Sequence, residues 1–84
     1  MKERVPASES IEKIQQILCE ILDIEKESLQ EDLSFAEDLF VDSLLAMEIV
    51  AAVEDAFGIE IAPETLMGIE TLGDLYRVTG SLAA

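Results

Sequence analysis

Apolar residues recur in the first part of this chain at the spacing of one helical face. They lie three, four and seven positions apart, at Ile11, Ile14, Ile17, Leu18, Ile21 and Leu22. Because a helix has 3.6 residues per turn, this spacing predicts a first long helix that buries one side. Ser8 or Ser10 is expected to be its N-cap.

A second apolar run predicts a long helix from Leu44 to Phe57. Gly58 follows it, and glycine readily takes the left-handed conformation that ends many helices. Ile59-Glu60-Ile61 alternates as a strand does, but no second strand is available to pair with it. We therefore interpret this tripeptide as a connector.

Two shorter helices are expected in the last third of the chain. A helix over Pro63–Met67 has proline in its first turn, where the missing N–H does no harm. Thr71 and Asp74 stand three positions apart, as the members of a capping box do, and open a last helix that continues to Gly80.

These patterns predict a single all-α domain over residues 1–84. The fold expected is a small four-helix bundle with a short third helix, and 84 residues leave room for one small core. Apolar residues also recur irregularly between residues 23 and 37, which indicates a long ordered loop between the first two helices. Residues 1–7 and 81–84 are expected to be flexible.

Charge is the strongest signal in the composition, since 5 basic and 19 acidic residues give a net charge of −14. Nucleic acid is excluded as a partner because phosphate backbones are bound by clustered Lys and Arg. No basic residue lies between Lys26 and Arg77, where thirteen acidic residues fall. This region is either a solvated surface that keeps the protein monomeric or a docking surface for basic partners.

Other classes of protein are disfavoured by what the sequence lacks. No apolar run approaches the roughly 18 residues of a membrane span, and Met1-Lys2-Glu3-Arg4 does not resemble a signal peptide, so a cytoplasmic protein without membrane insertion is expected. Cys19 is the single cysteine and histidine is absent, which argues against zinc. The segment from Asp38 to Asp42 lacks the ligand spacing of a calcium loop. No metal is expected.

Ser43 stands where the second long helix is expected to begin, so either it or Asp42 would serve as an N-cap. A catalytic serine would need a base beside it, normally a histidine, and the chain contains none. We therefore expect no catalytic residues and no enzyme activity.

Three features near Ser43 indicate a role other than helix capping. Leu44 and Met47 place apolar side chains next to the hydroxyl. Glu48 and Asp55 are two helical turns apart and share a face, with Glu54 close by. The positive end of the helix dipole suits an attached phosphodiester. A phosphate-linked group would be well placed here, beside a mixed apolar and acidic face that a partner can recognise.

The segment FAEDLFVDSLLAMEIVAAVEDAFGIEI resembles the modification region of acyl carrier proteins. In that family an Asp-Ser-Leu triplet starts the second helix, and the serine bears 4′-phosphopantetheine. The resemblance extends to Phe35–Leu39 before the triplet, to Phe57–Ile61 after the second helix and to Ile69–Asp74 before the last one. The triplet alone is weak evidence for the family, because three residues recur by chance. The flanking segments at the right spacing make the resemblance strong.

The resemblance implies a carrier of acyl intermediates, held as thioesters on an arm attached to Ser43. A phosphopantetheinyl transferase would supply the arm from coenzyme A, and synthase or acyl-transferring enzymes with basic docking surfaces would use it. Asp42 would cap the helix and help the transferase, while Leu44 and Met47 would give apolar contact. The acidic residues expected to meet Arg and Lys of these partners are Glu48, Glu54 and Asp55.

The sequence departs from the family beside the serine. Phe40 and Val41 replace the usual glycine and alanine, which puts a bulky apolar pair at the modification site and narrows the set of partners. Leu66 and Leu75 stand where alanines often face the acyl pocket, so they either reduce the cavity or simply fill the core. An aminoacyl, peptidyl or polyketide carrier of a specialised pathway stays open, as does an unmodified acidic interaction module.

Overall fold

The computed structural model describes residues 7–83, and this part of the chain contains four α-helices. They are α1 (Ala7–Leu22), α2 (Ser43–Phe57), α3 (Pro63–Met67) and α4 (Leu72–Ala83), with one 3-10 turn, η1 (Lys26–Ser28). Within these residues there is no strand, and an isolated bridge pairs Ser34 with Thr71. The predicted all-α fold with a short third helix is confirmed. None of the described helices is long and apolar enough to cross a membrane.

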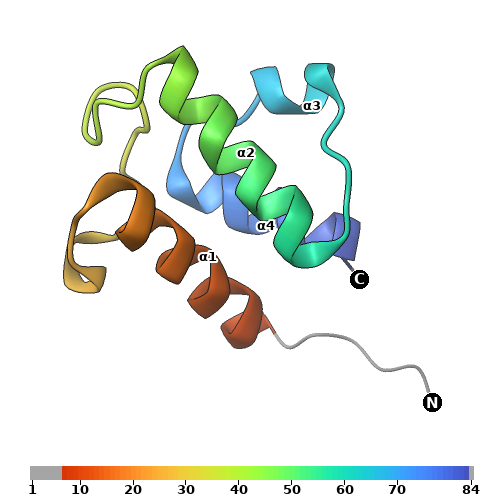
Figure 1. Ribbon diagram of the computed structural model, residues 1–84, viewed down its shortest axis with the longest axis horizontal. Coiled ribbons are helices and arrows are strands. Elements are labelled where there is room, and N and C mark those ends of the chain that lie inside the picture. The colour runs from red at the N-terminus through yellow and green to blue at the C-terminus, as the bar shows by residue number, and fades with distance from the viewer. Residues whose placement is uncertain (1–6, 84) are drawn as a thin grey trace.

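The three longer helices pack against one another around one small core. Helices α1 and α2 lie side by side and run in opposite directions, and α4 contacts both (Figure 1). Helix α3 lies on the other side of α2 from α1 in this view. Each long helix contributes apolar side chains at helical spacing, and loops supply the rest. The buried apolar residues are Ile14, Leu18, Leu29, Ile49, Val53, Ile61, Leu72 and Leu75.

The long segment between α1 and α2 is fixed to the start of α4 rather than free, as the sequence predicts. Leu29 is buried in the core. Gly73 packs so closely on this segment that a Cβ atom there would lie 3.2 Å from the carbonyl oxygen of Glu31. Three backbone N–H groups, those of Phe35, Leu72 and Gly73, donate to the carbonyl oxygens of Glu70, Leu33 and Glu31 at 3.0, 3.0 and 2.8 Å.

Most helix ends follow the sequence prediction, and two do not. Gly58 has a φ of 65° and its N–H donates to the carbonyl of Glu54, so it ends α2 as expected. The prediction that Ser8 or Ser10 caps the first helix is wrong, because α1 includes Ala7 and both serines lie inside it. The prediction that Gly80 ends the last helix is also wrong. The φ of Gly80 is not in the left-handed region, and α4 continues to Ala83. Of the segments expected to be flexible, residues 1–6 and 84 lie outside the described residues.

The capping box at the start of α4 is confirmed. The Oγ1 of Thr71 accepts from the N–H of Asp74 at 3.2 Å. The Oδ2 of Asp74 accepts in return from the N–H groups of Thr71 and Glu70, each at 3.0 Å. These backbone donors, that of Glu70 first, hold the pKa of Asp74 below its ordinary value of 3.8. The carboxylate therefore stabilises the segment that ties the long loop to α4.

The net charge and this cap together predict how stability depends on salt and pH. Because the acidic groups repel one another, the apo protein is expected to melt at higher temperature as salt rises, and as pH falls from 7 toward about 5. The contribution of Asp74 has the opposite sign. It is complete above the ordinary pKa of 3.8 and is lost as pH falls through the lowered value. A melting temperature that stays flat or falls with added salt would contradict the repulsion argument.

Two alanine variants separate the cap from the charge. Asp74→Ala and Asp55→Ala each remove one negative charge. Of these two carboxylates, only that of Asp74 accepts backbone hydrogen bonds in the described part of the chain. At pH 7 we expect Asp74→Ala to melt below the wild type and Asp55→Ala to melt at or above it. The deficit of Asp74→Ala should close in strong acid, where the wild-type carboxylate is also protonated. Equal melting temperatures at pH 7 would show that the cap contributes nothing.

Candidate functional site

Ser43 is the first residue of α2, and Asp42 is its N-cap. Asp42 has an extended backbone, with φ −90° and ψ −175°, and its Oδ1 accepts from the N–H of Leu45 at 2.9 Å. The capping role that the resemblance gave to Asp42 is thereby confirmed. Since the side chain of Asp42 already caps one of the free N–H groups of the first turn, the hydroxyl of Ser43 is not the capping group.

The hydroxyl of Ser43 is placed to accept a group from another molecule. Ser43 is exposed, and it lies at the positive end of the α2 dipole, which favours negative charge attached there. The sequence contains no histidine to activate it. The geometry therefore suits a site of covalent modification by an external enzyme.

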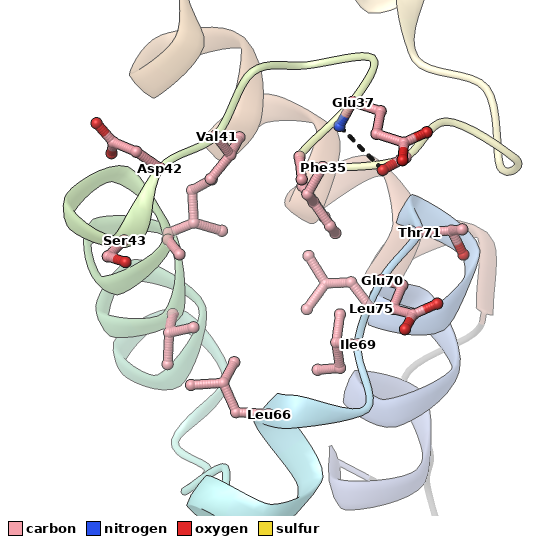
Figure 2. A pocket seen from close by; sticks show the side chains of 15 residues that line it. Phe35, Glu37, Val41, Asp42, Ser43, Leu66, Ile69, Glu70, Thr71 and Leu75 are labelled. Carbon is pink, nitrogen blue, oxygen red and sulfur yellow. Dashed lines mark hydrogen bonds between the residues drawn. The ribbon is translucent and has the colours of Figure 1, made fainter.

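A cavity of about 620 Å³ opens beside Ser43. Helix α2, the end of α3, the start of α4 and the long loop enclose it, as Figure 2 shows. Phe35, Val41, Leu66, Ile69 and Leu75 point into it from these different elements. Polar residues, among them Ser34, Glu37, Asp42 and Thr71, also line it. The cavity can thus hold an apolar group whose attachment point is at Ser43.

Part of this lining is predictable from the sequence. Leu66 and Leu75 both line the cavity, and Leu75 is only 2% exposed, so it belongs to the cavity wall and to the core at once. Ile49 and Val50 of α2 were not foreseen as lining, although their helical spacing marks the buried face. Phe35 was recognised only as part of the family's lead-in segment. The N–H of Phe35 donates to the carbonyl oxygen of Glu70, which ties this part of the loop to the segment before α4.

Several residues expected to face partners do lie on the surface. Leu44 and Met47 are 69% and 68% exposed, and Phe40 is 80% exposed. Glu48 and Asp55 are also exposed and lie two turns apart on α2. The acidic face of α2 therefore begins close to Ser43 and runs away from it, with apolar side chains at its start.

The backbone at Phe40 is unusual. Its φ is 56°, in the left-handed region, which costs a residue with a side chain roughly 1–2 kcal/mol. The only signal for such a turn is the glycine that the family usually has at this position, and phenylalanine replaces it here.

Val41 and Glu54 have internal roles that the sequence did not indicate. Val41 is half-buried, lines the cavity, and donates its N–H to the carbonyl of Phe35 at 2.7 Å. The expected apolar pair is therefore split, with Phe40 outward and Val41 inward. Glu54 is half-buried, and its Oε2 accepts from the N–H of Ile61 at 2.8 Å. Glu54 thus ties the connector after α2 to the helix.

Comparison with known proteins agrees with this geometry. A family model described as "Phosphopantetheine attachment site" matches residues 12–78. The chain is 41% identical over 76 residues to an acyl carrier protein of Saccharopolyspora erythraea, and the match covers 90% of this chain and 80% of that protein.

A solved structure shows the same arrangement of helices. The structure of the acyl carrier protein from Enterococcus faecalis matches with a TM-score of 0.79 at 33% sequence identity. The match covers 93% of this chain and 99% of the other. The likeness therefore includes nearly all of both proteins.

Proposed function

We propose, because the chain belongs to the acyl carrier protein family, that Ser43 carries its 4′-phosphopantetheine arm. The protein is a carrier and not an enzyme, and 4′-phosphopantetheine is its covalent cofactor. The observation that supports Ser43 is its exposed hydroxyl at the first position of α2, directly after the capping residue Asp42.

In this proposal the chain's own residues hold and present the arm. In the active site of a phosphopantetheinyl transferase, the Oγ of Ser43 attacks the phosphorus of coenzyme A that bears the pantetheine group. The pyrophosphate bond breaks, 3′,5′-adenosine diphosphate leaves, and the hydroxyl proton passes to a base of the transferase. The positive end of α2 favours the charge of that phosphodiester. The thiol of the bound group supplies the chemistry, since it carries acyl groups as thioesters. Asp42 keeps the first turn of α2 ordered, so that Ser43 stays in one place.

Carrier proteins of this kind interact with transferase and synthase enzymes. We propose that the exposed face of α2 meets these partners, with Leu44 and Met47 giving apolar contact and Glu48 and Asp55 pairing with Lys or Arg. Exposed ion pairs act mainly on the rate of association. We assign Glu54 to holding the connector instead, because its carboxylate accepts from Ile61. The monomeric state and the cytoplasmic location stay predictions of the sequence.

We also propose that the carried group is an apolar acyl chain that shelters in the cavity beside Ser43. The cavity supports this choice, because the apolar side chains of Ile49, Leu66, Ile69 and Leu75 are among those that line it. An apolar chain gains roughly 0.8 kcal/mol for each CH₂ that leaves water, whereas a polar aminoacyl group gains nothing from such a wall. Fatty-acid or related acyl biosynthesis is therefore favoured over an aminoacyl or peptidyl pathway.

A thermal-shift series tests this choice of cargo. The protein loaded with acetyl, butyryl, hexanoyl and octanoyl groups is expected to melt at progressively higher temperature, until the cavity is filled. Leu66→Phe, which narrows the cavity from a half-buried position, should reduce the gain for the longer chains. An aminoacyl group of similar length serves as the polar control. Equal melting temperatures for all loaded forms would overturn the cavity as the acyl site.

A further inference from the structure

Phe40 combines a strained backbone with an exposed aromatic side chain. The other described non-glycine residue with positive φ is Asp23, at 58°, and short polar residues tolerate this conformation far better than phenylalanine does. Two hydrogen bonds hold the turn around Phe40. The N–H of Leu39 donates to Ser34 at 3.0 Å, and the N–H of Val41 donates to Phe35 at 2.7 Å. The loop thus imposes the left-handed conformation on whichever residue follows Leu39.

Packing of the ring does not offset this strain in the free protein. With 80% of Phe40 exposed, little of the ring leaves water when the chain folds. Glycine or asparagine would take the same φ at lower cost. The phenyl ring is thus unfavourable for the isolated fold, and strain of this kind is concentrated at functional sites.

Phe40 lies close enough to Ser43 to be part of the interface with any enzyme that modifies Ser43. Phe40 and Ser43 stand three positions apart along the chain, so their Cα atoms are at most ~11 Å apart. A standard interface covers about 800 Å² of each partner, which corresponds to a radius of roughly 16 Å. A transferase that brings coenzyme A to the hydroxyl of Ser43 therefore covers Phe40 as well. Large aromatic side chains buried near the centre of an interface carry much of the binding energy.

The surroundings of Phe40 define the partner's surface. Three exposed acidic residues, Glu37, Asp38 and Asp42, stand within three positions of it. We propose that Phe40 is an aromatic anchor for the phosphopantetheinyl transferase, which receives the ring in an apolar pocket rimmed by Lys or Arg. The inference rests on the proposed attachment of the arm to Ser43. It gives Phe40 a positioning role in recognition, and Ser43 remains the residue that is modified.

Three substitutions at Phe40 test the anchor with a purified broad-specificity transferase and coenzyme A. Phe40→Gly and Phe40→Asn relieve the backbone strain and remove the ring, while Phe40→Leu keeps an apolar side chain. We expect the KM for the carrier to rise about tenfold or more for Gly and Asn and less for Leu, with kcat little changed. Leu82→Gln is the control, because it removes an exposed apolar residue at the far end of α4 (Figure 1).

Melting temperatures complete the test. Phe40→Gly and Phe40→Asn are expected to melt at or above the wild type, because the ring adds strain and no packing. Lower melting temperatures for both would show that the ring stabilises the free fold and would overturn the inference. An unchanged KM in both would overturn it too, while leaving Ser43 as the attachment site. Failure of the wild-type protein to accept the arm at all would instead refute the proposed function.

Discussion

Ser43→Ala is expected to give a folded helical protein that takes up no phosphopantetheine. Alanine is a good helix former, and Asp42 still caps α2 in this variant, so the helix should persist. With the hydroxyl gone, the phosphodiester has no oxygen from which to form. Circular dichroism checks the fold, and intact mass after incubation with transferase and coenzyme A checks the modification.

Ser28 and Ser34 offer matched controls for this variant. Ser28 is exposed in η1, and the Oγ of Ser34 accepts from the N–H of Glu37 at 3.1 Å. Alanine at either position should leave modification complete. If Ser43→Ala still gained the mass of the arm, the modified residue would be another serine, and the assignment of the site would be wrong.

Replacing both Glu48 and Asp55 with lysine is expected to slow transfer to Ser43 by roughly tenfold or more at low salt. Each exposed ion pair is worth up to about 1 kcal/mol, and reversal adds repulsion to the lost attraction. Stopped-flow or steady-state rates at low carrier concentration measure this effect, which should appear mainly in association. It should shrink as added salt reduces the Debye length below about 10 Å.

A double reversal on α1 is the matched control. Glu9→Lys with Glu20→Lys changes the net charge by the same amount, at two exposed positions on α1. Glu12 is less suitable, because its carboxylate lies 3.6 Å from the Nζ of Lys26. If the two double variants are equally slow, the acidic charge acts only through the overall field, and recognition depends on the apolar side chains near Ser43.

The helices were predictable because local patterns specify them. Helical spacing located the long helices, and the capping box of Thr71 and Asp74 located the start of α4. The end of α4 was not predictable from Gly80. Glycine permits a left-handed conformation but does not require it, and Gly80 does not adopt it, so α4 continues to Ala83. A glycine alone is therefore a weak signal for the end of a helix.

The placement of Ser43 and Asp42 was predictable, and the geometry around them less so. The Asp-Ser-Leu triplet predicted that both lie at the start of α2, because their arrangement depends on one helix end. The opposite directions of Phe40 and Val41 follow from hydrogen bonds within the loop, which no periodic pattern encodes. Glu54 reaches Ile61, seven positions later, only because the chain reverses at Gly58. The cavity likewise needs four separate segments to come together.

Intact mass of the wild-type protein, after incubation with a broad-specificity phosphopantetheinyl transferase and coenzyme A, tests the central claim most directly. Fragmentation of the product then locates the added group. We predict one phosphopantetheine per chain, on the peptide that contains Ser43. A mass that does not change, under conditions that modify a known carrier protein in the same tube, would contradict the account and favour an unmodified acidic interaction module.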